Sequence, residues 1–217
     1  MHDQNIVVFT GARISAESGL GTFRDRGGLW EKFSIEEVAT PEGWKADPKK
    51  VLDFYNDRRR QVRQARPNPA HFALAELARH YTVSLITQNI DDLHERAGSN
   101  NILHLHGEIM KARSTKDQGL IYDLGNKGIA VGDLCELGSQ LRPHVVWFHE
   151  EVPEFPHAAE IAGNADVLLV VGTSLAVYPA ASIIEYVIPG TPVFVVSPEL
   201  ESEPGNMTWY KEKAAAK

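Results

Sequence analysis

The sequence contains a single cysteine, Cys135, among its 217 residues. One thiol cannot form a disulfide framework within the chain, and it cannot supply the four thiolates of a common structural zinc site. A disulfide-rich secreted domain is therefore excluded, and the composition is compatible with a reducing compartment.

Long hydrophobic runs are also missing. The longest apolar run is Val167–Val171, far below the roughly 20 residues that span a bilayer. The first residues, MHDQNIVVFTG, lack a basic stretch followed by an apolar segment of signal-peptide length. We therefore expect a soluble cytoplasmic protein with no membrane partner.

An excess of positive charge is absent too. The chain has 22 lysines and arginines against 29 acidic residues, a formal net charge of −7. This balance argues against a nucleic-acid-binding protein that relies on bulk charge. Arg59, Arg63 and Arg66 recur at helical spacing without interleaved aromatic residues, so we interpret them as a solvated helix face.

Four short runs are almost entirely apolar and rich in β-branched residues: Ile6–Phe9, Val83–Ile86, Val167–Val171 and Val193–Val196. Such runs are typical of parallel strands buried on both faces. Amphipathic helices are predicted between strands over Pro69–Tyr81 and Pro179–Val187, each beginning with proline. The alternation predicts an α/β fold with a doubly wound parallel sheet.

Two segments, 24–66 and 113–141, interrupt this alternation. We expect them to form a small inserted lobe. Residues 1–23, 67–112 and 142–217 would then make the larger domain.

Small residues follow three of the predicted strands, at Gly11, Gly172 and Ser197. Turns of this kind let a ligand approach the backbone, and three of them fit one nucleotide along the carboxyl edge of the sheet. Alternatively, they are tight turns that only end the strands. The stretch from Gln88 to Asp91 could hydrogen-bond to amide or hydroxyl groups of a ligand. Alternatively, it could cap a helix.

Two histidines, His104 and His106, lie two residues apart. They could bind a metal together with His94, one could act as a general base, or both could be hydrogen-bonded core residues. Tyr55 and Arg58 share a predicted helix face, where a phenol and a guanidinium could hold a carboxylate. The apolar stretch 145–148 could pair with an extended peptide or form a core strand.

In this combination and order, the segments TGARISAESG, TFRD, TQNIDDLHERAG, HLHGE, LRPHVVWF and GTSLAVYPA resemble the sirtuins, which are NAD-dependent protein lysine deacylases. The resemblance runs from about Asn5 to Pro198. It implies a Rossmann-like domain, NAD as cofactor and acyl-lysine proteins or peptides as substrates. It also implies transfer of an acetyl or succinyl-type group to give nicotinamide and O-acyl-ADP-ribose. We expect a monomer.

The resemblance also implies roles for individual residues. His106 would be the catalytic base, with Asn89 and Asp91 also in the catalytic set. Val145, Val146, Trp147 and Phe148 would flank the acyl-lysine, and Tyr55 and Arg58 would bind a distal acyl carboxylate, as in the bacterial desuccinylase branch. The residues implied to contact NAD are Gly11, Ala12, Ser15, Glu17, Ser18, Thr22, Phe23, Arg24, Gln88, Asn89, Asp91, Gly172, Thr173, Ser174 and Ser197.

The sequence departs from the sirtuin pattern at several positions. Ser114 and the lone Cys135 stand in the stretch where most sirtuins have two zinc-binding cysteine pairs, so we expect no metal. Arg13 stands where the sirtuin Gly-Ala-Gly turn has its second glycine. There it would strain the backbone, block the nucleotide site or pair with the pyrophosphate of NAD. His149 replaces a glycine, and Ser197 an asparagine. The alternatives are a silent NAD or ADP-ribose binder, an ADP-ribosyltransferase or NAD hydrolase, and a metallohydrolase.

Overall fold

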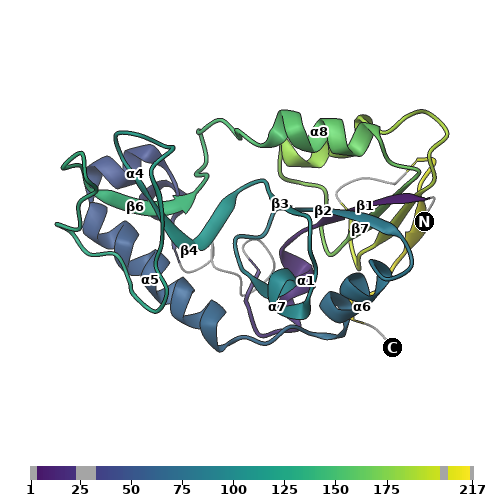
Figure 1. Ribbon diagram of the computed structural model, residues 1–217, viewed down its shortest axis with the longest axis horizontal. Helices are drawn as coiled ribbons and strands as arrows, with labels where there is room; N and C mark the ends of the chain where they lie inside the picture. Colours follow the sequence, from purple (N-terminus) through teal and green to yellow (C-terminus); the bar gives the residue numbers. More distant parts are fainter. Residues whose placement is uncertain (1–3, 23–32, 201–204, 216–217) are drawn as a thin grey trace.

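A parallel sheet forms the centre of the larger part of the molecule (Figure 1). The computed structural model describes residues 4–22, 33–200 and 205–215. The six strands follow the order β3-β2-β1-β7-β8-β9, and every neighbouring pair is parallel. Their bounds are β1 Asn5–Thr10, β2 Thr82–Thr87, β3 Ile102–His104, β7 Val167–Val171, β8 Val193–Val196 and β9 Thr208–Tyr210. The predicted α/β fold with a parallel sheet is confirmed.

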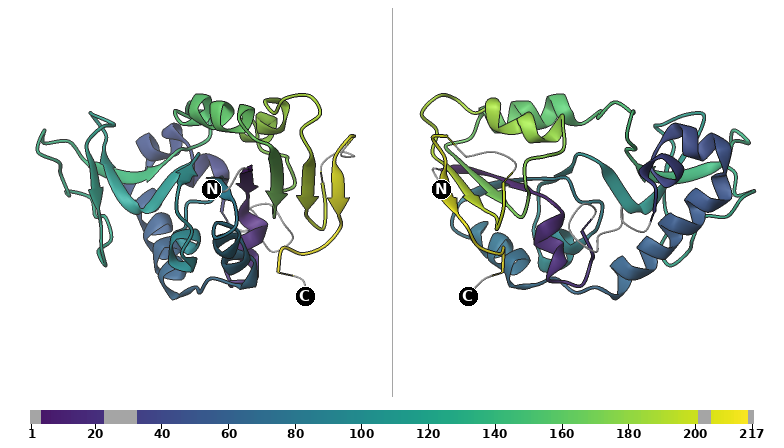
Figure 2. Two further views of the ribbon diagram at one scale, coloured as in Figure 1. Left: turned by 45° about the vertical axis from the view of Figure 1, so that its right-hand side comes forward. Right: turned by 180° about the vertical axis from the view of Figure 1, so that it is seen from behind.

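Both faces of this sheet are buried, as the continuous apolar runs predicted. Val7 and Phe9 of β1 belong to one hydrophobic cluster, and Ile6 and Val8 belong to the opposite one, because successive strand residues point to opposite faces. Helices α8 (Phe155–Gly163) and η1 (Ala180–Glu185) cover the first face, and α1 (Ala12–Ala16), α6 (Pro69–Leu77) and α7 (Leu93–Ala97) cover the second (Figures 1 and 2).

Two predicted helices differ from the observed ones in length or type. Helix α6 begins at Pro69 as predicted, where Asn68 caps it, but it ends at Leu77 rather than Tyr81. The segment after Pro179 is a 3-10 helix rather than an α-helix. The spacing of apolar residues therefore predicted the buried stripe, but it did not determine the hydrogen-bond pattern.

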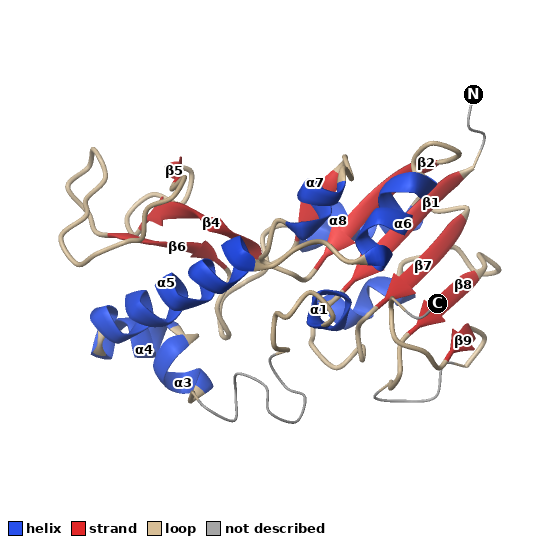
Figure 3. Cartoon of the chain, turned by 90° about the horizontal axis from the view of Figure 1, so that it is seen from below, coloured by secondary structure: helices blue, strands red, loops and turns tan. Residues whose placement is uncertain are grey.

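A second, antiparallel sheet forms the small lobe, with strand order β5-β4-β6 (Figure 3). Its strands are β5 Ile121–Asp123, β4 Gly107–Ser114 and β6 Leu141–Val145, and it is accompanied by α3 Ile35–Val38, α4 Pro41–Ala46 and α5 Pro48–Gln64. The sheet takes in residues 107–112 and 142–145, which the sequence-based boundaries assigned to the larger domain. One hydrophobic cluster joins α5 to Ile109 and Trp147.

Two arginines of α5, Arg59 and Arg63, bind the backbone of the small lobe. Arg59 is fully buried, and it donates hydrogen bonds to the carbonyl of Ile109 at 2.7 Å and to Oδ1 of Asn56 at 2.6 Å. Arg63 donates to the carbonyl oxygens of residues 125, 126 and 127. The expected solvated stripe is therefore wrong at Arg59. Burial lowers the pKa of that guanidinium to about 10, so it remains charged at neutral pH.

The stretch where the sirtuin resemblance led us to look for zinc-binding cysteines contains a cluster of two serines and one cysteine. The hydroxyl oxygens of Ser114 and Ser139 lie 2.8 Å apart, and Cys135 Sγ lies 3.4 and 3.2 Å from them. Zinc prefers thiolate, imidazole and carboxylate ligands, so this donor set does not fit a structural zinc ion. Across residues 4–22, 33–200 and 205–215, no group of three or more His, Cys, Asp or Glu residues could hold a metal.

The helices of the described part of the chain are also unsuited to a bilayer. None of them is both long and apolar enough to cross one.

Candidate active site

A cavity lies where the carboxyl ends of β1, β2 and β7 face the small lobe. Both parts of the molecule contribute to its wall. The residues of the wall that the sequence predicted are Ala12, Thr22, Tyr55, Gln88, Asn89, His106, Val145, Val146, Trp147, Phe148, Gly172, Thr173 and Ser174. One cavity therefore brings together segments that are far apart in the sequence.

The turns after β1 and β7 pack backbone against backbone. The N–H of Gly11 donates to the carbonyl of Val171, and the N–H of Arg13 donates to the carbonyl of Gly172. A Cβ atom on Gly11 would lie 2.7 Å from Thr173 Cβ, and one on Gly172 would lie 2.4 Å from the nitrogen of Ile14. Gly172 also has a φ of +66°, which favours glycine. Glycine is therefore required at both strand ends.

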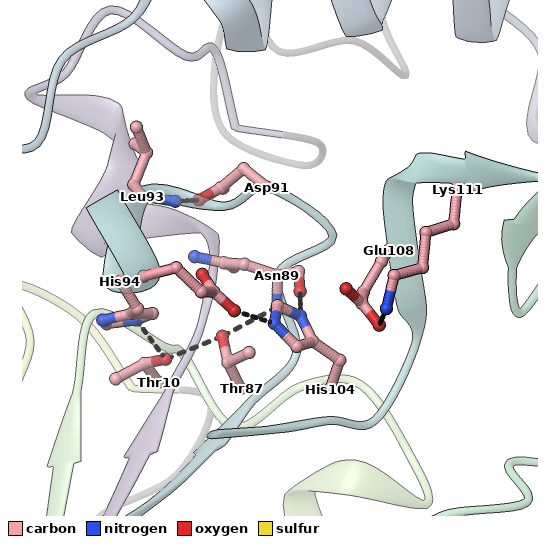
Figure 4. A network of polar contacts seen from close by, with 10 residues as sticks. Thr10, Thr87, Asn89, Asp91, Leu93, His94, His104, Glu108 and Lys111 are labelled. Atoms are coloured by element: carbon pink, nitrogen blue, oxygen red, sulfur yellow. Dashed lines mark hydrogen bonds and ion pairs between the residues drawn. The ribbon is translucent and has the colours of Figure 1, made fainter. Parts of the chain in front are cut away.

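Asn89 is almost fully buried, and it is held from several sides (Figure 4). Its backbone N–H donates to Thr87 Oγ1, and its side-chain amide donates to Ser15 Oγ at 3.1 Å. Ser15 in turn donates to Asp91 Oδ2 at 3.0 Å. This chain of hydrogen bonds fixes the Asn89 amide in the cavity wall and orients Asp91 behind it.

Burial raises the pKa of Asp91, and four contacts oppose that rise. The opposing contacts are hydrogen bonds from Leu93 N–H and the Ser15 hydroxyl and the positive charges of Arg58 and His104. A carboxylate that accepts hydrogen bonds is stabilised in its charged form. Asp91 can therefore hold its neighbours in place without facing the cavity itself.

His106 is arranged as a neutral base. Its Nδ1 lies 3.0 Å from the carbonyl of Gln88. A carbonyl oxygen only accepts, so Nδ1 must carry the proton and the lone pair must lie on Nε2. Burial lowers the pKa of His106, so the ring is neutral at pH 7. A neutral imidazole in the cavity wall can accept a proton from a bound hydroxyl group.

The other two histidines of the possible metal set have different environments. His104 lies between the carbonyl of Asn89 at 3.0 Å and Glu95 Oε1 at 2.7 Å, and this ion pair raises its pKa despite burial. His94 Nε2 bonds to Thr10 Oγ1 at 3.0 Å, deep under the cavity. Because both nitrogens of His104 are engaged as donors, this ring has no lone pair to offer a metal.

Tyr55 and Arg58 share a face of α5, but only Tyr55 lines the cavity. The Arg58 guanidinium donates to the carbonyl of Gly21 at 2.9 Å and to Gln61 Oε1 at 3.2 Å. Desolvation raises the pKa of the buried Tyr55 phenol above its usual range, so this group stays neutral. Of the expected carboxylate-binding pair, only Tyr55 therefore contributes to the cavity wall.

The apolar stretch after β6 is tied down by Glu150. Its carboxylate accepts hydrogen bonds from Arg142 at 2.6 and 3.0 Å and from the N–H of Trp147 at 2.8 Å. The Arg142 guanidinium also lies 3.3 Å from the centre of the Trp147 ring. Strand β6 ends at Val145, so residues 146–148 form a buttressed segment of the wall rather than a continuation of the strand.

Comparisons with known proteins agree with this geometry. The sequence pattern of the Sir2 family matches residues 11–179. This chain belongs to the Sir2 family. It is 51% identical over 213 residues to an NAD-dependent protein deacylase of Helicobacter pylori, covering 97% of this chain and 91% of that protein.

Solved Sir2 structures agree over almost the whole chain. A Sir2 homologue in complex with NAD has a TM-score of 0.85 at 39% identity, covering 97% of this chain and 85% of the other. A Sir2 protein bound to an acetylated peptide has a TM-score of 0.83 at 28% identity, covering 97% and 88%.

The Sir2 pattern changes at Arg13 without straining the backbone. Arg13 lies inside α1 and is not among the described residues with positive φ. Its side chain lines the cavity and donates to Glu199. His149 is different, because its φ is +68°, a conformation that favours glycine, the residue that the resemblance implied at this position.

Several predicted residues lie behind the cavity wall or away from it. Ser18 Oγ accepts a hydrogen bond from Asn68, Glu17 is exposed at the end of α1, and Ser197 is buried against the carbonyl of Glu199. The predicted residues that do not line the cavity are Gly11, Ser15, Glu17, Ser18, Arg58, Asp91 and Ser197. Phe23 and Arg24 lie outside the described residues.

The sequence interpretation did not assign several other wall residues. These are Ala39, Ile90, Glu150, Val152, Val177, Tyr178 and Pro179. Glu150 could have been noticed, because an acidic pair, Glu150 and Glu151, follows the apolar stretch after His149, and Arg142 precedes that stretch as a possible partner. The apolar members carry no such signal.

Proposed function

We propose that this Sir2 protein removes acyl groups from protein lysines, with NAD as cosubstrate. The observation that carries the proposal is the neutral His106 in the same cavity wall as Gln88, Asn89 and the Gly172 turn. These groups combine a base, amide donors and a backbone cradle at one place. The single cysteine fits a reducing compartment, and the proposal therefore includes a cytoplasmic location. A monomeric state is a separate part of the proposal.

The residues present fit NAD. Gly11 and Gly172 let the two strand-end turns pack closely against each other, which brings Ala12, Arg13 and Thr173 to the cavity wall where a nucleotide would lie. The buried amide of Asn89 is held in place for a carboxamide or ribose hydroxyl. When bound, NAD supplies the activated nicotinamide–ribose bond, which gives nicotinamide and O-acyl-ADP-ribose as products.

The chain supplies orientation, proton transfer and exclusion of water. His106 Nε2 accepts the proton of a ribose hydroxyl, and the Gln88 carbonyl stabilises the protonated ring through Nδ1–H. The hydrogen bonds of Ser15 hold Asn89 and Asp91 in fixed positions. Trp147 and its apolar neighbours shield the reacting groups from water.

The acyl group that this cavity accepts best is proposed to be a short neutral one. Tyr55 forms the wall on the α5 side, whereas Arg58 does not line the cavity and donates to the carbonyl of Gly21 and to Gln61. We therefore propose that acetyl-lysine is processed faster than succinyl-lysine. Competition between matched peptides in one reaction measures the ratio of kcat/KM values directly.

The test of the base is His106→Ala, with His80→Ala as a matched control. His80 lies on the surface, with 68% of its side chain exposed. Mass spectrometry of an acetyl-lysine peptide with NAD is expected to detect at least about 100-fold slower turnover for His106→Ala and no change for His80→Ala. Turnover retained by a folded His106→Ala protein would contradict the role of His106.

A further inference from the structure

Arg13 brings a permanent positive charge to the cavity wall. Among the described residues that line the cavity, it is the one arginine or lysine. The carboxylate in the same wall, Glu150, is already paired with Arg142. The chain as a whole has a net charge of −7. Arg13 therefore offers the cavity a guanidinium, its charge shared with the exposed carboxylate of Glu199, at a place where an anionic group fits.

Glu199 holds the Arg13 guanidinium in position. Nη1 of Arg13 donates to the Glu199 carbonyl and Nη2 donates to Glu199 Oε2, each at 3.0 Å. The same carbonyl also accepts the hydroxyl of Ser197 at 2.7 Å. The Arg13 side chain is only 16% exposed, whereas that of Glu199 is 75% exposed. The folded chain has therefore already ordered the arginine before a ligand arrives, which lowers the entropic cost of binding.

The backbone N–H groups around Arg13 are already used in hydrogen bonds, so an anion in the cavity needs a side-chain donor. The N–H groups of Gly11 and Arg13 are used by the carbonyls of Val171 and Gly172, and the N–H of Ile14 is used by the carbonyl of Gly11. An anion between these turns cannot bond to those three groups. A guanidinium has several N–H donors in one plane, and it can engage two oxyanions at once.

We infer that Arg13 binds the pyrophosphate of NAD and that Glu199 is its positioning residue. This inference rests on the proposed function, because it needs an NAD-type ligand in the cavity. The guanidinium supplies a charged donor beside the Gly172 turn, whose own N–H is used by the carbonyl of Val196. The contact belongs to this chain, since the sirtuin pattern has glycine at this position.

The test is calorimetric titration with ADP-ribose and, separately, with adenosine, which lacks phosphate. Arg13→Gln is expected to weaken ADP-ribose binding at least about tenfold, because a charge-assisted contact is lost. The same variant leaves adenosine affinity unchanged and makes ADP-ribose binding less sensitive to salt. Arg13→Lys retains part of the affinity because it keeps the charge. Glu199→Gln weakens binding by a smaller factor, because its carbonyl still accepts from Arg13.

Arg79→Gln is the matched control, because Arg79 pairs with Glu76 on the surface, with 75% of its side chain exposed. It is expected to bind ADP-ribose as the wild type does. Thermal melting establishes that each variant is folded. If the wild type binds ADP-ribose and Arg13→Gln binds it equally or more tightly, the Arg13 inference is wrong and the proposed function stands. If the wild type does not bind ADP-ribose, both are wrong.

Discussion

Acid should destabilise this protein through two buried histidines under the active site. His71 and His94 are fully buried, and their ring centres lie 4.9 Å apart. His71 Nδ1 accepts the backbone N–H of Asn68, so a proton on that nitrogen would break the cap of α6. Burial lowers the pKa of His71 to about 4 and that of His94 to about 3. Both rings are therefore neutral in the folded protein down to about pH 5.

The sign and size of the effect follow from proton binding. In the unfolded chain each histidine has its ordinary pKa of about 6.5, so between pH 6 and 5 it holds about 0.9 proton that the folded protein lacks. Stability is therefore present above the unfolded pKa and is lost as the pH falls. Between pH 6 and pH 5, each ring lowers the unfolding free energy by about 1.2 kcal/mol, and the pair lowers it by about 2.4 kcal/mol. This is a large share of a typical unfolding free energy of about 5–15 kcal/mol.

Urea unfolding at pH 6 and pH 5 measures this loss. His104 adds little in this window, because its raised pKa leaves it protonated in both states. Other groups also lower the unfolding free energy between pH 6 and pH 5. The decisive quantity is therefore the difference in this loss between the wild type and each variant. His71→Asn and His94→Asn should each reduce the loss by about 1.2 kcal/mol, whereas His157→Asn, at an exposed site, should leave it unchanged.

A second measurement keeps this prediction testable if a variant does not fold. NMR titration of the wild type follows the nine histidines individually. The rings of His71 and His94 should not titrate above pH 5. A pKa near 6.5 for either ring, or an unchanged pH dependence in both variants, would refute the reasoning.

Four further predictions follow from single residues. His149→Gly should raise the unfolding free energy by about 0.5–1 kcal/mol, because glycine relieves the positive φ, while His149→Ala should give no gain. Gly172→Ala should cost at least about 1–3 kcal/mol more than Gly19→Ala in urea unfolding, because both glycines have positive φ but only the first faces a backbone atom at 2.4 Å. The acid limb of kcat/KM, measured in a pH profile, should lie below pH 6.5, because the lowered pKa keeps His106 neutral and active there. Acetyl-lysine should compete successfully with succinyl-lysine in a mixed-peptide assay, because Arg58 is engaged elsewhere.

Local patterns predicted four of the six strands of the parallel sheet: β1, β2, β7 and β8. An apolar run such as Val167–Val171 carries its own signal, because a strand buried on both faces needs apolar side chains at every position. The parallel topology then brings the residues after β1, β2 and β7 to one edge without further information. This is why Gln88, Asn89 and Gly172, which the sirtuin resemblance implied to contact NAD, line one cavity.

Side-chain contacts between residues far apart in the sequence could not be predicted from local patterns. Helical spacing identified a face of α5, but it did not reveal that Asn56 and Arg59 on that helix hold the chain around Ile129 and Ile109. Arg58 shares a helix face with Tyr55, yet its guanidinium turns to Gly21, which is 37 residues away in the sequence. Such contacts determine which groups the ends of long side chains bind, and helical periodicity does not predict them.

The predicted small-lobe segment 113–141 is shorter than the antiparallel sheet, which begins at Gly107 and ends at Val145, for a similar reason. Strand β4 begins directly after the His106 turn and pairs with β6, more than 20 residues later in the chain. Glycine spacing marked the irregular loops between these strands. The strands themselves are short and mixed in polarity, so the sequence gives little sign of their pairing.

The most direct test of the central claim is the coupling of nicotinamide release to acyl-lysine. Purified protein would be incubated with NAD, with and without an acetyl-lysine peptide, and all products would be quantified by mass spectrometry. The proposed chemistry predicts nicotinamide, O-acetyl-ADP-ribose and free lysine peptide in equal amounts, and no nicotinamide without the peptide. Nicotinamide release that is independent of the peptide, or no release by folded protein that binds ADP-ribose, would contradict the proposed deacylase function.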